Sequence, residues 1–239
     1  MTAVDQTLEN VAGYAPGRVS GLHHAEQTLL DRLVVPGMRV LELGCGGGRV
    51  TRALLDHGAV VTACDLSDDG LTLIRGQLGG SERLDIRQAD ARDVPFEDDT
   101  FELVFFAWNG LDWMRPESER ERVVKEAFRV LTPGGRFVFS SHNPLGTLFT
   151  WRGVRSTYMW RWRLRYLVSG DVTRRYFRDP GGLLLFQASP AYVVRQVKAA
   201  GFAFDSMLGA SGATGNRLLL TAFSAWPYYV FSKPDAGSA

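Results

Sequence analysis

The fold is decided by Val40-Leu41-Glu42-Leu43-Gly44-Cys45-Gly46-Gly47-Gly48-Arg49-Val50, a short apolar run that ends in glycines. An amphipathic segment follows, with Val50, Leu54 and Leu55 on one face and Gly58 as its stop signal. This pattern predicts a strand, a glycine turn and a helix. Glycines allow a tight turn and a close approach of a ligand to the backbone, and the start of a helix offers free N–H groups.

The spacing of the glycines narrows the choice of ligand. A dinucleotide fingerprint has its last glycine at a position that is occupied here by Arg49. Residues 60–64 read as a second strand, and Asp65 stands at its end, where a carboxylate suits the hydroxyls of a ribose. We therefore expect an adenosine-like ligand, and the glycines alone leave nicotinamide and other nucleoside cofactors open.

Four ordered motifs carry a family resemblance. They are the glycine stretch followed by Asp65, the segment 88–96 (Gln-Ala-Asp-Ala-Arg-Asp-Val-Pro-Phe), the apolar run 101–106, and the Leu-Thr-Pro-Gly-Gly turn that opens 131–139. Together they resemble the nucleoside-binding half of the class I S-adenosylmethionine-dependent methyltransferases. The resemblance covers roughly residues 36–142, and the remainder matches only in general layout.

The resemblance implies an α/β fold: a Rossmann-like seven-stranded mixed sheet with helices on both faces, its last strand antiparallel, and a substrate cap inserted after the fifth strand. One methyltransferase domain is expected over residues 1–239. Its expected parts are an N-terminal lid and helix (1–35), the cofactor-binding core (36–143), the variable cap (144–188) and the C-terminal part of the sheet (189–233).

The resemblance also implies S-adenosylmethionine as the cofactor and a set of residues that bind it. These are Tyr14, Arg18, Glu42, Gly44, Cys45, Gly46, Asp65, Leu66, Asp90, Ala91 and Ala107. In this assignment Asp90 accepts from the adenine amino group beside the Ala91 N–H, although an Asx-type turn explains the same residue. Tyr14 and Arg18 either meet the carboxylate of the cofactor or lie on a surface loop.

Two further residues are expected to act on the methyl acceptor. His142 follows the fifth predicted strand at the carboxyl edge, and an imidazole there can serve as a general base or anchor the loop. Asn109 lies in the loop after the fourth strand, where it can position the acceptor. Asp112, in the same loop, can orient an acceptor hydroxyl or amine, or cap the next helix.

Composition bounds the class of protein. The chain has 239 residues, a net charge of +1, 45% hydrophobic and 22% charged residues, which is typical of one soluble globular domain without a field that attracts nucleic acid or acidic lipid. We expect no signal peptide and no membrane span, because no apolar run approaches about 18 residues. Cys45 and Cys64 are expected to be buried thiols in the cytoplasm. The four histidines show no ligand spacing, so no metal site is predicted.

The segment 144–188 is crowded with aromatic residues and arginines. It is predicted to form a pocket for a small-molecule acceptor, with an aromatic body and an anionic group as the favoured chemistry. A lid that only packs on the core, and an RNA methyltransferase that uses this Arg/Trp-rich cap, are alternatives. Arg49 disfavours a nicotinamide-dependent oxidoreductase, and a cofactor-binding module without catalysis also fits. The expected reaction is methyl transfer to an oxygen or nitrogen of the acceptor. The sequence does not decide between oxygen, nitrogen, carbon and sulfur as the acceptor atom, and it leaves the oligomeric state open.

Overall fold

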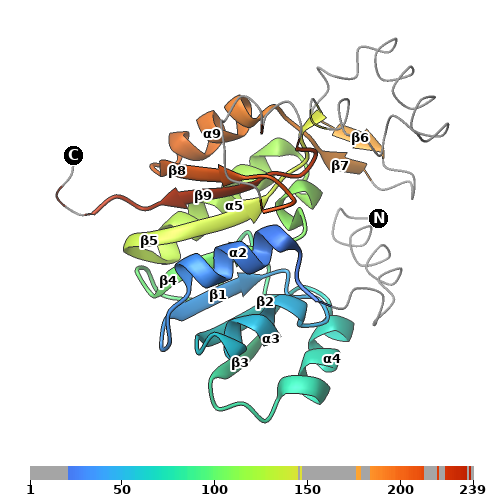
Figure 1. The fold of residues 1–239 in the computed structure, drawn as a ribbon, viewed down its shortest axis with the longest axis vertical. Coiled ribbons are helices and arrows are strands. Elements are labelled where there is room, and N and C mark those ends of the chain that lie inside the picture. Colours follow the sequence, from blue (N-terminus) through green and yellow to red (C-terminus); the bar gives the residue numbers. More distant parts are fainter. Residues whose placement is uncertain are drawn as a thin grey trace.

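The computed structural model describes residues 21–144, 146, 176–178, 184–212, 220, 224–235 and 237. Its main feature is a seven-stranded sheet with helices against it (Figure 1). The strands of this sheet are β1 (Arg39–Leu43), β2 (Val60–Asp65), β3 (Leu84–Gln88), β4 (Phe101–Phe106), β5 (Leu131–Ser140), β8 (Ala203–Leu208) and β9 (Tyr228–Ser232). The helices are α2 (His24–Leu33), α3 (Arg49–Asp56), α4 (Asp68–Leu78), the 3-10 turn η1 (Gly110–Trp113), α5 (Glu117–Val130) and α9 (Pro190–Ala199).

The strand order is β3-β2-β1-β4-β5-β9-β8. The pairs from β3 to β5 are parallel, whereas β9 runs antiparallel to both β5 and β8. This confirms the predicted Rossmann-like mixed sheet with an antiparallel last strand. A separate hairpin of β6 (Tyr176–Arg178) and β7 (Leu184–Phe186) lies within the predicted cap, and the rest of 147–183 lies outside the described residues.

Helices cover both faces of the sheet, which explains why the central strands are buried almost throughout. One hydrophobic cluster joins α2, α3 and α4 to the sheet through residues such as Leu29, Leu54 and Ile74. The other joins α5 and α9 to the opposite face through residues such as Val124 and Val197. The parallel strands are therefore packed between these two hydrophobic clusters, one on each face of the sheet.

The predicted elements agree with the observed ones in type, with one clear difference in extent. The fifth strand, β5, begins at Leu131 and includes the Pro133-Gly134 turn, whereas the turn residues by themselves indicate a strand only from Arg136. Its pairing with β4 starts at Phe101 opposite Leu131 and then shifts register. The irregularity accommodates the turn within the strand, and Gly134 takes a φ of +76° there.

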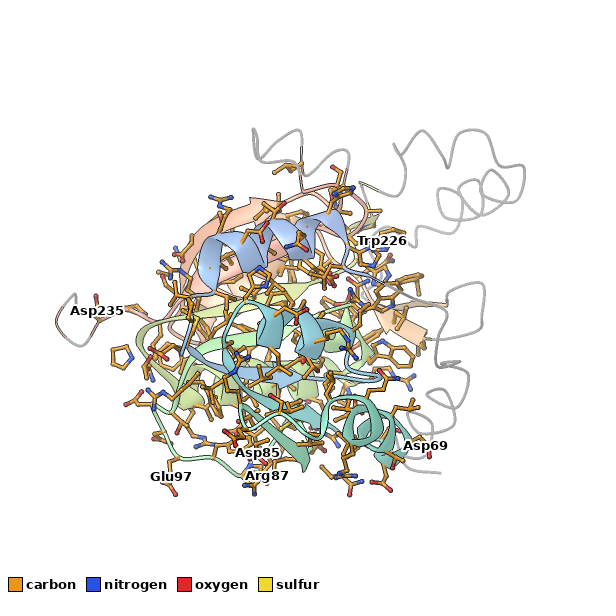
Figure 2. The ribbon with its side chains drawn as sticks, turned by 60° about the horizontal axis from the view of Figure 1, so that its bottom comes forward. Asp69, Asp85, Arg87, Glu97, Trp226 and Asp235 are labelled. Carbon is orange, nitrogen blue, oxygen red and sulfur yellow. The ribbon has the colours of Figure 1, made fainter. Side chains whose placement is uncertain are left out.

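This topology brings three chain segments to one edge of the sheet. β1, β4 and β5 are adjacent and parallel, so the segments that leave their carboxyl ends meet at the same edge. Ligands of open α/β sheets bind outside this edge, where the strand order reverses between β1 and β4. Figure 2 shows Trp226, which precedes β9, at one side of the molecule and Asp235, which follows that strand, at the opposite side. No helix among the described residues is long and apolar enough to cross a membrane.

Candidate functional site

The turn after β1 is built from glycines in conformations that side chains disfavour. Gly44, Gly46 and Gly48 have φ angles of +63°, +51° and +82°. A Cβ on Gly44 would lie 2.7 Å from the ring of Phe106, whereas a Cβ on Gly46 would meet no atom within 4 Å. The turn is therefore packed against Phe106 on one side and open above Gly46, where a ligand can reach the backbone.

Asp65, at the end of β2, lies against this turn. Its Oδ2 accepts the Gly46 N–H at 2.8 Å and its Oδ1 accepts the Ser67 N–H at 2.9 Å. A carboxylate oxygen has more than one lone pair, so Asp65 can accept further donors such as two hydroxyls. Leu66 follows, and its carbonyl accepts the side-chain amide of Gln88 at 3.0 Å. The geometry is compatible with the predicted ribose role of Asp65.

Glu42 and Cys45 lie behind the open edge rather than on it. The Glu42 carboxyl is 2% exposed and accepts the Thr51 hydroxyl at 2.6 Å, and its burial raises its pKa to about 8. The Cys45 thiol is buried as well, which raises its pKa, while the Cys45 N–H donates to the Cys64 carbonyl at 3.0 Å. Through its side chain, Glu42 supports the turn from the α3 side, and any role for it toward a ligand remains a prediction.

Asp90 forms the Asx-type turn that was the alternative to its adenine role. Its Oδ1 accepts the Arg92 N–H at 2.9 Å, and the Arg92 guanidinium binds both of its oxygens. Burial raises the pKa of Asp90, but the hydrogen bonds from Arg92 outweigh it and hold this pKa below its usual range. Arg92 also donates to Glu119 at 3.0 Å. Ala91, between the two paired residues, is half-buried. The contact of its N–H with the adenine ring stays a prediction.

The loop after β4 is held in an unusual conformation. Ala107 is buried, and both Trp108 and Asn109 have positive φ angles, +51° and +54°. The Asn109 N–H donates to the Ser140 hydroxyl at 2.8 Å, which ties this loop to the end of β5. The Asn109 Oδ1 is buried and has no hydrogen-bond partner among the described residues. A strained backbone and an unsatisfied buried oxygen are typical of a position that binds a ligand.

Arg49 is the first residue of α3, and its guanidinium forms a buried ion pair. Its guanidinium binds both oxygens of Glu26, a fully buried carboxylate that also accepts the Tyr228 hydroxyl at 2.7 Å. Burial raises the pKa of Glu26, but Arg49 more than offsets this and lowers it. The Trp108 ring lies 5.3 Å from the Arg49 guanidinium and 4.6 Å from the His23 ring. Glu26 and Arg49 thus tie α2 and β9 to the glycine turn.

His142 lies beyond β5 with its imidazole held by an aspartate. Asp112 Oδ2 accepts both the His142 N–H, at 2.7 Å, and the His142 Nδ1, at 2.8 Å. Because a carboxylate can only accept, Nδ1 carries a proton, and in the neutral form of the ring Nε2 therefore presents the lone pair. Asp112 is fully buried, so the expectation that it orients an acceptor hydroxyl directly is wrong. Its other oxygen accepts Arg120 at 2.7 Å and Ser141 at 2.6 Å.

Aromatic rings surround the exposed side of this imidazole. Phe177 of β6 contacts it edge-on at 5.1 Å, and Trp226 lies perpendicular to it at 6.3 Å. Trp226 is 50% exposed, so its indole is available to a further partner. Gln187 pairs with His142 through a backbone bridge, which brings the segment after the β6–β7 hairpin to the end of β5. Among the described residues, the site therefore combines the imidazole of His142 with the apolar rings of Phe177 and Trp226.

The structure joins some of the predicted site residues and leaves others out of view. The carboxyl edge formed by β2, β1, β4 and β5 carries both predicted acceptor residues and five of the predicted cofactor residues, which are Gly44, Gly46, Asp65, Leu66 and Ala107. Asp90 and Ala91 follow the neighbouring strand β3. Tyr14 and Arg18 lie outside the described residues, as do most of the cap aromatics. Sequence reasoning missed Glu26 and Arg120 and misread Asp112. Arg120 could have been suspected as an arginine among the inward-facing positions of a helix, next to Val124.

Comparison with known proteins finds similarity to methyltransferases. Residues 41–139 match the family model described as "Methyltransferase domain". The chain is 39% identical over 104 residues to a demethylmenaquinone methyltransferase of Clavibacter sepedonicus, covering 44% of this chain and 41% of that protein. The chain thus spans less than half the length of that relative. It is 29% identical over 219 residues to a phthiotriol/phenolphthiotriol dimycocerosates methyltransferase of Mycobacterium tuberculosis, covering 89% of this chain and 74% of that protein.

A solved structure extends the likeness to the whole fold. The 1,6-didemethyltoxoflavin-N1-methyltransferase of Burkholderia thailandensis, solved with bound 1,6-didemethyltoxoflavin and S-adenosylhomocysteine, superimposes with a TM-score of 0.68. The sequence identity is 16%, and the match covers 97% of this chain and 87% of that one. At this identity the likeness concerns the fold alone.

Proposed function

We propose that the chain, whose residues 41–139 match a methyltransferase domain, is a class I S-adenosylmethionine-dependent methyltransferase, and that it transfers the methyl group of S-adenosylmethionine to an oxygen or nitrogen of a small-molecule acceptor. One observation carries the transfer step. The Asp112-bound imidazole of His142 stands at the same sheet edge as the open glycine turn. A nucleoside cofactor and a base are thereby provided for at one edge of the sheet, after β1 and β5, which are separated only by β4.

The residues present fit the cofactor. The open space above Gly46 allows close approach to the backbone, and the unsatisfied Asn109 Oδ1 requires a donor, such as an ammonium, hydroxyl or amine of a bound molecule. Asp65 would hold the ribose hydroxyls, and Glu42, Asp90 and the backbone around them would complete the site. When bound, the cofactor supplies a methyl group that is already electrophilic because it is attached to a sulfonium.

The chain must then hold the acceptor in line and receive its proton. Positioning of this kind is worth about 7–11 kcal/mol. His142 Nε2 would accept the proton of the acceptor O–H or N–H as the new bond to carbon forms, and the Nδ1–H···Asp112 contact would stabilise the resulting imidazolium. Phe177 and Trp226 favour an acceptor with a flat apolar body. The free, buried cysteines fit a reducing compartment such as the cytoplasm.

Titration calorimetry tests the cofactor. Wild-type protein should bind S-adenosylmethionine and S-adenosylhomocysteine, and Asp65→Ala should weaken both by at least about tenfold because two hydroxyl acceptors are lost. Asp85→Ala, on the exposed edge strand β3, is the matched control and should bind like wild type. Wild-type protein that binds neither compound, or Asp65→Ala with unchanged affinity, would contradict the assignment.

Turnover tests the base. With tritium-labelled S-adenosylmethionine and a panel of hydroxylated and aminated aromatic acceptors, His142→Gln should lose about 10²–10⁴-fold in rate. Its affinity for S-adenosylhomocysteine should stay within about twofold of wild type, because the cofactor does not depend on the imidazole. Full turnover by His142→Gln would remove the general base from the mechanism.

A further inference from the structure

Arg120 is a fully buried arginine that the mechanism above leaves unused. It projects from the first half of α5, and none of its side chain is exposed. Burial lowers the pKa of this guanidinium, and the nearby Asp112 carboxylate opposes that shift. A buried cation is costly unless it is paired and hydrogen-bonded, so its retention at this place calls for an explanation.

The contacts of Arg120 converge on the carboxylate that holds His142. Its Nη1 donates to Asp112 Oδ1 at 2.7 Å, and its Nη2 lies 3.4 Å from the Ser141 hydroxyl. Its Nε donates to the Gln196 Oε1 on α9 at 2.9 Å. The face of the guanidinium lies 4.3 Å from the ring centre of Phe186. The side chain is therefore fixed on several sides, and it fixes Asp112 in turn.

The two oxygens of Asp112 divide between two different tasks. Oδ1 takes Arg120 and the Ser141 hydroxyl, whereas Oδ2 takes the backbone and ring nitrogens of His142. The positive charge of Arg120 balances the negative charge of Asp112. Without that balance, a buried carboxylate would be compensated by a proton on the imidazole, and a protonated imidazole cannot act as a base.

We propose that Arg120 is a positioning residue: by balancing and pinning Asp112, it keeps His142 as the neutral Nδ1–H tautomer, with Nε2 free to receive the acceptor proton. This inference rests on the role of His142 in the proposed function and adds the device that sustains it. Arg120 acts only through Asp112 and need not touch the acceptor or the cofactor.

Among the described residues, the other groups that contact His142 carry no charge. Phe177 from β6, Trp226 from the segment before β9 and the Gln187 backbone bring no charge. At the start of α5, Glu117 binds the Tyr192 hydroxyl and the Gln196 amide instead. In the part of the chain that the structure describes, Asp112 is the one charged side chain with a hydrogen bond to the imidazole.

Nuclear magnetic resonance of the full chain labelled with nitrogen-15 in histidine tests the proposal without cofactor or acceptor. The chain has four histidines, and the His142 signal is the one that disappears in His142→Gln. Wild type should show the Nδ1–H tautomer near neutral pH. In Arg120→Met the midpoint of His142 protonation should rise by about one pH unit or more, because Asp112 then faces the imidazole alone. Arg122→Met, an exposed arginine two residues along the same helix, is the matched control and should leave the midpoint in place.

Two further variants keep the test decisive if Arg120→Met fails to fold. Arg120→Lys retains the cation and should keep the wild-type tautomer and midpoint. The double variant Asp112→Asn/Arg120→Met removes both charges and should give a midpoint below that of Arg120→Met, or below that of Arg120→Lys if the single variant is lost. A wild-type Nε2–H tautomer, or equal midpoints across the Arg120 variants, would overturn the proposal. Absence of S-adenosylmethionine binding by the wild-type protein would instead contradict the proposed function. It would not affect this proposal, because the histidine titration does not involve the cofactor.

Discussion

Glu42 has a carboxyl group that the fold removes from water, and its replacement by glutamine should stabilise the protein increasingly as pH rises. The side chain is 2% exposed, and the hydrogen bond to it comes from the neutral Thr51 hydroxyl at 2.6 Å. Burial raises its pKa from 4.5 to about 8. The Thr51 hydrogen bond and the Arg49 charge lower this pKa by less than burial raises it, and the neighbouring Glu26 and Asp65 add to the rise. Glutamine keeps the size of the side chain and an oxygen for Thr51, but it never carries the charge.

The size of the effect follows from the two pKa values. Between pH 4.5 and 8 the folded chain holds a proton on Glu42 that the unfolded chain releases. The stability that this proton contributes is fully present below pH 4.5 and is lost as pH rises through 8. A difference of 3.5 pKa units corresponds to about 5 kcal/mol, at about 1.4 kcal/mol per unit. The free energy of unfolding of Glu42→Gln, relative to that of wild type, should therefore increase as pH rises over this range.

Urea unfolding at pH 5, 6, 7 and 8 measures the gain. The informative quantity is the difference between the two proteins at each pH, because other titrating groups are common to both. This difference should increase steadily with pH and level off above pH 8. Glu97→Gln, at an exposed carboxyl on the surface labelled in Figure 2, is the control and should track wild type. A difference between Glu42→Gln and wild type that does not change with pH would refute the assigned protonation of Glu42.

The remaining predictions concern ligands. If the cationic cofactor ionises Glu42, calorimetry near pH 7 in two buffers of different ionisation enthalpy should detect release of up to one proton, and Glu42→Gln should release none. Gly44→Ala should weaken S-adenosylmethionine binding by at least about tenfold, since its Cβ would lie 2.7 Å from the Phe106 ring, whereas Gly47→Ala, with no atom within 4 Å of the added Cβ, should bind like wild type. Asn109→Gly should fold as stably as wild type or up to about 1 kcal/mol better, because it removes an unsatisfied oxygen at a positive φ, and should lower turnover. Turnover equal to wild type would leave Asn109 without a role in the site.

The cofactor half of the fold could be predicted from sequence because its signals are local. Gly44, Gly46 and Gly48 predict a turn with backbone conformations that only glycine adopts easily, and the observed positive φ angles confirm this prediction. The resemblance carried by these ordered motifs implied the Rossmann-like mixed sheet, and the observed strand order confirms it. The extent of β5 was not predictable in this way, because its pairing across the Pro133-Gly134 turn depends on a register shift against β4.

The acceptor half resisted prediction because its contacts are distant in sequence. Asp112 and His142 are 30 residues apart, and only the adjacency of β4 and β5 brings them together. A short acidic residue in a loop looks like a turn or a capping residue until its partners are known. Arg120 gave a weaker signal still, since an arginine in an amphipathic helix ordinarily faces water. Glu26 is buried for a similar reason, through a partner 23 residues away.

This contrast follows from how the two ligands would be recognised. The cofactor would be held largely by the backbone of the glycine turn and by acidic residues at strand ends. The fold fixes such features, so they can be predicted from a single sequence. An acceptor would instead be selected by side chains that the fold merely presents, here His142, Phe177 and Trp226. The charges next to the imidazole are paired within the protein, Asp112 with Arg120, as is the nearby pair of Glu26 with Arg49. In the described part of the site this leaves an uncharged rim around one basic nitrogen, which favours an acceptor that arrives neutral and gives up its proton there.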